Sequence, residues 1–198
     1  LPQSPELSGT YAVFLKKVRK DYDRAEEYYK KAIELDRKNT NYLVNYAILL
    51  KNIRKDYDRA EEYYKKAIEL DSKNTDNLLS YAVFLLSIGK TEDGLSALER
   101  VSPYLNDPAN TDGLDAEFWF YAFTHRPAEQ RDEALRNLKR TLQSGERSPN
   151  WDLSQNVAQA CKGGHPDAAW LEKLAAVISE GADIGILDAW PRWKKVNV

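Results

Sequence analysis

Few side chains in this 198-residue sequence have the chemistry of a catalytic or metal-binding site. His125 and His165 are the only imidazoles, and Cys161 is the only thiol. A single cysteine excludes an internal disulfide and a zinc site of the CxxC type. Carboxylates are abundant, but they alternate with lysines as on solvated helix faces, and no Gly-rich phosphate loop, HExxH or GxSxG pattern occurs. We therefore predict a protein that is not an enzyme and that needs no metal or cofactor.

The same few residues have simpler structural interpretations. Cys161 falls on the apolar stripe of an expected helix, which favours a buried, inert thiol over a nucleophile. His125 occupies a position where a bulky packing residue is expected. The tyrosine pairs 28–29 and 63–64 are expected to lie in the core rather than to serve as phosphorylation sites.

Composition narrows the classes of partner. The chain has 29 basic and 31 acidic residues, a formal net charge of -2, so its overall field does not favour nucleic acid or an anionic membrane. No apolar run approaches the roughly 18 residues that a spanning helix needs. With 42% hydrophobic and 30% charged residues the sequence is typical of a globular protein. The composition therefore argues against nucleic acid as a partner and against a membrane span, and we expect a cytoplasmic location.

An internal repeat organises the first half of the chain. Residues 20–36 and 55–71 both read KDYDRAEEYYKKAIELD, identical at all 17 positions and 35 residues apart. The segment Tyr11–Leu15 also recurs at Tyr46–Leu50 and Tyr81–Leu85 with the same spacing. Repeats of this length indicate stacked supersecondary units that share one core.

Each repeat predicts two helices. Residues 41–53 place Leu43, Tyr46, Ala47 and Leu50 at i, i+3, i+4 and i+7, and residues 57–71 follow with a second apolar stripe. Glu61 precedes Lys65 by four residues, as Glu62 precedes Lys66, which supports an exposed helix face.

The units resemble tetratricopeptide repeats. The unit at 41–74 supplies the characteristic residues Leu43, Tyr46, Ala47, Leu50, Ala60, Tyr64 and Ala67. The unit before it supplies Ser8, Tyr11, Ala12, Leu15, Ala25, Tyr29 and Ala32, and the unit after it Leu78, Tyr81, Ala82, Leu85, Gly94, Leu98 and Val101. The first two units have one extra residue in the turn between helices, and the family's proline after the second helix is replaced by Arg37, Ser72 and Asn106. The resemblance covers residues 8–104 and implies an all-α, right-handed superhelical solenoid of antiparallel helix hairpins.

The second half is expected to continue the pattern in degenerate form. Residues 112–144 and 150–180 predict two further hairpins, and Ile184, Leu187, Trp190 and Trp193 predict a C-terminal capping segment over the open end of the stack. The aromatic composition changes near Tyr104, from tyrosine to tryptophan. We expect a disordered or vector-derived lead at 1–7, three repeats at 8–104, and degenerate hairpins with a cap at 105–198.

The resemblance also implies a binding surface, because the first helices of such units line an inner groove. The residues that would face it are Val13, Lys16, Lys17, Val44, Asn45, Ile48, Lys51, Asn52, Leu79, Val83 and Leu86. This face is apolar with lysines at one edge, which suits a partner helix or a short hydrophobic peptide. Some family members bind a peptide's C-terminal carboxylate with polar residues, but only Asn45 matches that set, which argues against such a clamp.

Other interpretations stay open. The groove would also suit a second copy of the chain, which predicts a homo-oligomer, and the repeats would suit a regulatory part of a larger enzyme. Lysines and arginines at 16–20 and 51–55 form a basic edge that we expect to be a solvated face. His165-Pro166-Asp167 resembles the signature of J-domain cochaperones, but the flanking pattern of that family is missing.

Overall fold

The structure, a computed structural model, describes residues 4–106, 114–149 and 151–197. These residues form helices and no strand. The chain divides into two compact units, Leu1–Tyr81 (unit 1) and Ala82–Val198 (unit 2). The division lies inside helix α5 (Thr75–Ser87), whereas the aromatic composition changes near Tyr104. The boundary after Tyr81 is one of packing, and the boundary near Tyr104 is one of composition. The domain division at residues 104–105 therefore stays a prediction.

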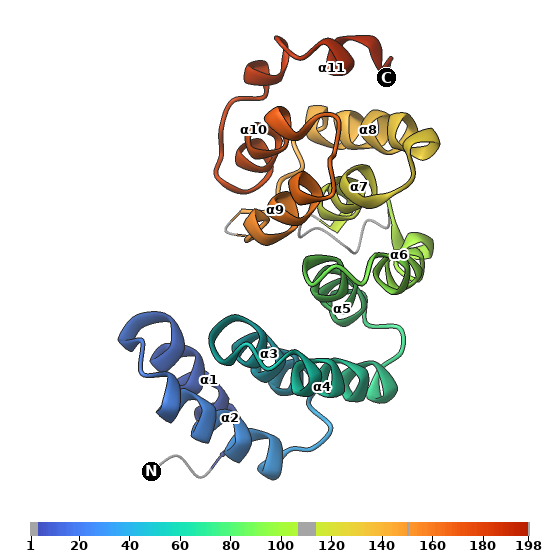
Figure 1. The fold of residues 1–198 in the computed structure, drawn as a ribbon. Coiled ribbons are helices and arrows are strands. Elements are labelled where there is room, and N and C mark those ends of the chain that lie inside the picture. The colour runs from blue at the N-terminus through green and yellow to red at the C-terminus, as the bar shows by residue number, and fades with distance from the viewer. Residues whose placement is uncertain (1–3, 107–113, 150, 198) are drawn as a thin grey trace. The chain divides into compact units, whose positions relative to one another are not determined.

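Unit 1 consists of two complete helical hairpins and the first part of α5. Its elements are α1 (Pro5–Phe14), η1 (Leu15–Arg19), α2 (Tyr22–Leu35), α3 (Thr40–Leu49), η2 (Leu50–Arg54) and α4 (Tyr57–Leu70). Helices α1 and α2 run side by side, as do α3 and α4 (Figure 1). These elements match the predicted helices at 41–53 and 57–71.

Small and aromatic residues make the core of the hairpins. The alanines at positions 12, 25, 32, 47, 60 and 67 are fully buried, and so are Tyr29 and Tyr46. An alanine lets two helix backbones approach closely, and the tyrosine of the next layer fills the remaining volume. The predicted packing positions of the first two repeats are therefore buried, except Tyr11, which is half-buried.

The extra residue of the first two repeats does not lie in a loop. It lies in η1 and η2, two π-helical turns that continue α1 and α3. Each π turn ends at a lysine with left-handed backbone, Lys20 or Lys55, both at φ 56°. The next backbone N–H then bonds six residues back, from Asp21 to Leu15 O and from Asp56 to Leu50 O, each at 3.1 Å. The corresponding helix α5 has no π turn, and Gly89 follows it with φ 84°.

Unit 2 contains the degenerate hairpins. Its further elements are α6 (Thr91–Glu99), η3 (Ser102–Tyr104), α7 (Leu114–His125), α8 (Ala128–Gln143), α9 (Ser154–Lys162), α10 (Ala168–Ser179), η4 (Ile184–Leu187) and α11 (Pro191–Lys195). Helices α7 and α8 form one hairpin, and α9 and α10 form the next. They fall where the sequence pattern predicted them.

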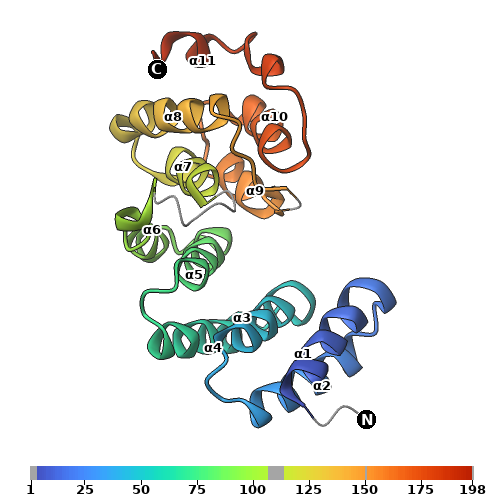
Figure 2. The same ribbon diagram turned by 180° about the vertical axis from the view of Figure 1, so that it is seen from behind.

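The C-terminal segment packs as a cap on unit 2. Leu187, Trp190 and Trp193 are buried, and α11 lies beside α8 (Figure 2). Lys139 of α8 holds the segment, because its Nζ donates to the carbonyls of Trp193 at 2.8 Å and Val196 at 3.0 Å. Burial of three large apolar side chains accounts for the docking of so short a segment.

Candidate functional site

The predicted groove residues of unit 1 divide into an accessible and a buried set. The structure leaves six of them half-buried, namely Val13, Lys16, Asn45, Ile48, Lys51 and Asn52, and leaves Lys17 exposed. Val44 and Leu79 are buried, with 9% and 3% of their surface accessible. The accessible apolar part of this surface therefore consists of Val13 and Ile48, which are 35 residues apart and hold equivalent places in α1 and α3.

Val83 and Leu86 belong to unit 2, and both are buried. Leu86 packs directly on Gly94 of α6, where an added Cβ would lie 2.7 Å from Leu86 Cδ2. The apolar surface expected from the sequence is thus largely core in the third repeat. The resemblance assigned these residues to the inner face, but it could not show that neighbouring elements cover them.

Helices α1 and α3 meet closely at one place on this surface. A Cβ on Gly9 would lie 2.5 Å from Cε1 of Tyr42, so the Tyr42 ring packs against the bare backbone of α1. A larger residue at position 9 would require the Tyr42 ring to move. Gly9 and Tyr42 therefore mark a close contact between the helices that carry Val13 and Ile48.

Lys16 is a polar residue of this surface whose pKa departs from its ordinary value. Burial and the neighbouring charge of Lys17 lower the pKa of Lys16 to about 8. Its Nζ lies 5.9 Å from the centre of the Tyr29 ring. An anionic ligand group beside Lys16 would favour the protonated form and raise this pKa again.

The basic edge is partly engaged in holding the repeats together. Arg54 donates through Nε to Glu26 at 2.8 Å and through Nη2 to Asp23 at 2.5 Å, both on the preceding hairpin. Tyr46 also donates to Glu26, at 2.9 Å. Burial opposes ionisation of Glu26, yet the hydrogen bonds from Lys30, Arg54 and Tyr46 prevail and lower its pKa to about 2. Arg54 therefore acts as a structural residue here.

The cysteine does not lie where the sequence suggested. Cys161 is exposed, not buried, so the expectation of a buried thiol was wrong. The turn of α9 that carries it lines a cleft between α9 and α10, and no element of the described chain fills that cleft. The predicted cap covers α8 and α10 elsewhere.

The tyrosine pairs and His125 follow their structural interpretations. Tyr28, Tyr29 and Tyr64 are buried and Tyr63 is half-buried. His125 is also half-buried, and its burial is the main reason why its pKa falls to about 4. These side chains contribute to packing.

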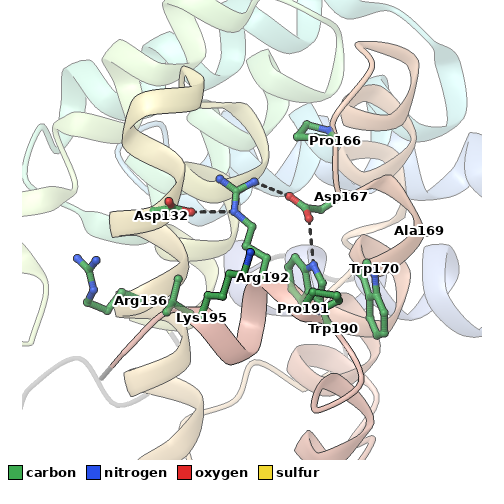
Figure 3. Close-up of a pocket in the computed structure, with 11 residues that line it drawn as sticks. Asp132, Arg136, Pro166, Asp167, Ala169, Trp170, Trp190, Pro191, Arg192 and Lys195 are labelled. Carbon is green, nitrogen blue, oxygen red and sulfur yellow. Dashed lines mark hydrogen bonds and ion pairs between the residues drawn. The ribbon is translucent and has the colours of Figure 1, made fainter.

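The His-Pro-Asp tripeptide is part of the fold. His165 is buried, with its Nε2 3.2 Å from the carbonyl of Phe123, while its Nδ1 accepts from the backbone N–H of Asp167 at 3.1 Å. This pattern requires the neutral tautomer with hydrogen on Nε2. The Asp167 carboxylate accepts from Trp190 Nε1 at 3.0 Å and from Arg192 at 2.6 Å (Figure 3).

Asp167, Trp190 and Arg192 border a cavity of about 520 Å³ beside the cap. Arg192 bridges Asp167 and Asp132, since its Nε also donates to Asp132 at 2.8 Å (Figure 3). Trp170 stacks on Trp190 with 5.7 Å between ring centres. The charged groups at the centre of this cavity thus satisfy one another and anchor α11.

Neither metal chemistry nor a membrane span emerges from the structure. Among the residues that it describes, no three His, Cys, Asp or Glu side chains are grouped to hold a metal ion. No helix in the same part of the chain is long and apolar enough to cross a membrane.

Comparisons with known proteins agree with the repeat pattern. Two family models described as tetratricopeptide repeat match the chain, at residues 51–114 and 19–39. A search of curated proteins finds no match. The crystal structure of YrrB, described as a TPR protein with an unusual peptide-binding site, is similar with a TM-score of 0.53 and 17% identity, covering 92% of this chain and 89% of that one. Residues 19–39 and 51–114 therefore match tetratricopeptide repeats, and the likeness to YrrB shows a similar helical fold.

Proposed function

We propose that the protein is a non-catalytic adaptor or scaffold that captures a peptide or helix of a partner protein on the α1–α3 face of unit 1. The observation that carries the proposal is the equivalent placement of Val13 and Ile48 on successive repeats, accessible and flanked by Lys16 and Lys51. Two apolar contacts bordered by cations suit a segment with apolar residues and an acidic group. The similar fold of YrrB, a TPR protein that has a peptide-binding site, also supports peptide capture.

The Lys16 ammonium gives this surface a chemical preference. Its pKa of about 8 means that part of the population is neutral near pH 8. Binding of a carboxylate beside it would take up a proton, so affinity for an acidic peptide should rise as pH falls from 9 to 7. The two lysines would orient the ligand, and Val13 and Ile48 would supply burial.

Peptide display on the immobilised full chain tests the proposal. Selected peptides should lose about tenfold or more in affinity when Ile48→Glu or Val13→Glu places a carboxylate on the face. Leu70→Glu is the matched control, because Leu70 is an exposed leucine on the second helix, α4. Circular dichroism and melting must first show that all three variants fold like the native chain.

Two results would contradict the proposal. Peptides that bind all variants equally would exclude the α1–α3 face, and a library without any enriched peptide would exclude peptide capture. If sedimentation shows a dimer that Ile48→Glu dissolves, the face belongs instead to a second copy of the chain.

A further inference from the structure

The hairpin of α9 and α10 carries a cleft of about 940 Å³ that is formed by residues of unit 2 alone. Each helix contributes four lining residues at i, i+3, i+4 and i+7. From α9 these are Ser154, Val157, Ala158 and Cys161, and from α10 they are Glu172, Ala175, Ala176 and Ser179. Matching stripes of this period on two adjacent helices form a continuous channel that runs along the helix axes, as a third helix packed between them would.

Small side chains line the middle of both stripes of the channel. Ala158 and Cys161 are exposed, and Ala176 is half-buried. Below them, Leu153 and Val157 are buried and form the apolar floor. Alanine and serine let another helix backbone approach closely along these stripes, and the long side chains of the lining are those of Trp151, Glu172 and Glu180.

The cap leaves this channel uncovered. Trp190, Trp193 and Arg192 attach the C-terminal segment to α8 and to Asp167, on the other side of α10. None of the cap residues lines the α9–α10 channel. The sequence predicted a cap over the open end of the stack. The C-terminal segment covers α8 and the start of α10, but it does not cover the α9–α10 channel.

The channel has a single sign of charge. Its lining residues include Asp152, Glu172 and Glu180 and no lysine, arginine or histidine. All three acidic residues are exposed. Glu180 is also the C-cap of α10, where the helix dipole adds to the attraction for cations.

The acidic residues lie at the two ends of the channel. Because α9 and α10 are antiparallel, Glu172 lies at the end of Cys161, while Asp152 and Glu180 lie at the end of Ser154 and Ser179. Seven to eight helical residues separate the ends, which is about 10–12 Å at 1.5 Å per residue. Two basic residues seven positions apart on an incoming helix would reach both ends.

From this geometry we infer that the α9–α10 channel docks an amphipathic helix of a partner protein, with an apolar stripe between basic residues seven positions apart. The partner's alanines and leucines cover Val157, Ala158 and Ala176, and its lysines or arginines face Glu172 and Glu180. The inference is independent of the α1–α3 face, because it rests on residues of unit 2 alone.

A display library of 14-residue helices tests the inference on the full-length chain. Two positions seven apart are held as Lys, Glu or Ser, and the positions between them vary among apolar residues. The native chain should enrich the lysine set. The double variant Glu172→Lys, Glu180→Lys should lose about tenfold or more in affinity for those peptides and prefer the glutamate set.

Matched controls separate the channel from general charge. Glu129→Lys, Glu133→Lys changes the net charge equally on the exposed face of α8 and should leave the enriched peptides bound. Bound peptide should also slow alkylation of Cys161 by iodoacetamide, and since this is the sole cysteine, the label reports the channel alone. Peptide affinity should fall with added salt.

Three outcomes would overturn the inference. These are enrichment without preference among the three sets, binding that the Glu172 and Glu180 changes do not alter, and unprotected Cys161 in the complex. A dimer of the native chain that Glu172→Lys, Glu180→Lys disrupts would assign the channel to a second copy. A failure to bind peptides at the α1–α3 face would not change the results for the channel. The two proposals can therefore be contradicted independently.

Discussion

At the scale of single residues, Glu26 joins the first two repeats, although the sequence pattern did not single it out. It receives hydrogen bonds from Tyr46 and Arg54 of the next hairpin and an ion pair from Lys30, at 2.8 Å, of its own helix. The sequence could suggest the pair with Lys30, which is four residues away. The contact with Arg54 depends on how two hairpins stack, and no local pattern encodes it.

We expect Glu26→Gln to lower the free energy of unfolding by about 1.5–3 kcal/mol, because a charged acceptor is lost from partly buried donors. Glu27→Gln, one residue along on the exposed face of α2, should change it by less than about 0.5 kcal/mol. Urea denaturation at pH 7 measures both. Equal effects of the two substitutions would show that Glu26 is only a surface charge.

The direction of the pH effect follows from the lowered pKa of Glu26. Its folded pKa of about 2 lies below the ordinary value of 4.5. Its contribution is therefore complete above pH 4.5 and is lost as the pH falls toward 2.

At the scale of elements, the repeat length predicted the helices but not the form of their ends. A unit of 35 residues shows that one residue has been added, yet a longer loop and a π-helical turn use the same number of residues. The structure has the π turn in η1 and η2. The left-handed backbone of Lys20 and Lys55 could not be predicted from the residue type, because glycine is the residue that usually marks this conformation.

Lys55→Gly should therefore stabilise the protein, by about 0.5–1 kcal/mol, because a side chain in left-handed backbone is strained and glycine is not. Glu62→Gly is the matched control inside α4, where the same replacement residue should cost about 1 kcal/mol. Thermal unfolding measures whether each variant is more or less stable than the native chain. A loss of stability in Lys55→Gly would mean that the lysine side chain makes a contact worth more than the backbone strain.

The exposed Cys161 shows a second limit at this scale. Leu153, Val157 and Cys161 follow a helical period, and the pattern correctly made Leu153 and Val157 buried. Whether the last turn of the stripe is covered depends on where the C-terminal segment docks. The docking position of the C-terminal segment depends on the hydrogen bonds that Trp190 and Arg192 donate to Asp167, which is 23 to 25 residues earlier in the chain.

At the scale of the whole molecule, the two units carry different chemical groups. All five tryptophans and both histidines belong to unit 2, while ten of the twelve tyrosines belong to unit 1. Tryptophan fluorescence therefore reports the unfolding of unit 2. The family resemblance predicted the helical fold of both units. Four of the eleven expected groove residues are nevertheless buried, because burial depends on all neighbouring elements.

Acid should weaken unit 2 through His125, whose folded pKa of about 4 lies below the ordinary 6.5. The unfolded chain binds the proton first, so stability is complete above pH 6.5 and is lost as the pH falls toward 4. Between pH 7 and 5 the native protein should lose up to about 2 kcal/mol more than His125→Leu.

Denaturation followed by tryptophan fluorescence at the two pH values measures this difference. Burial raises the pKa of Asp115 and Glu146 in the same unit, which acts in the opposite direction, but both residues are present in both proteins and cancel in the comparison. An identical pH dependence of the two proteins would show that His125 is protonated as easily in the folded chain as in the unfolded one.

The identity of residues 20–36 and 55–71 has a consequence for how this chain can evolve. A second copy of residues 20–54 placed after Arg54 would meet the sequence KDYDRAEEYYKKAIELD again, so every new junction already exists in the protein. The added hairpin would bring its own Glu26, Tyr46 and Arg54 contacts. Unequal recombination between the two copies can therefore lengthen or shorten the array by whole hairpins in frame. The contacts between neighbouring hairpins would be ones that the protein already has.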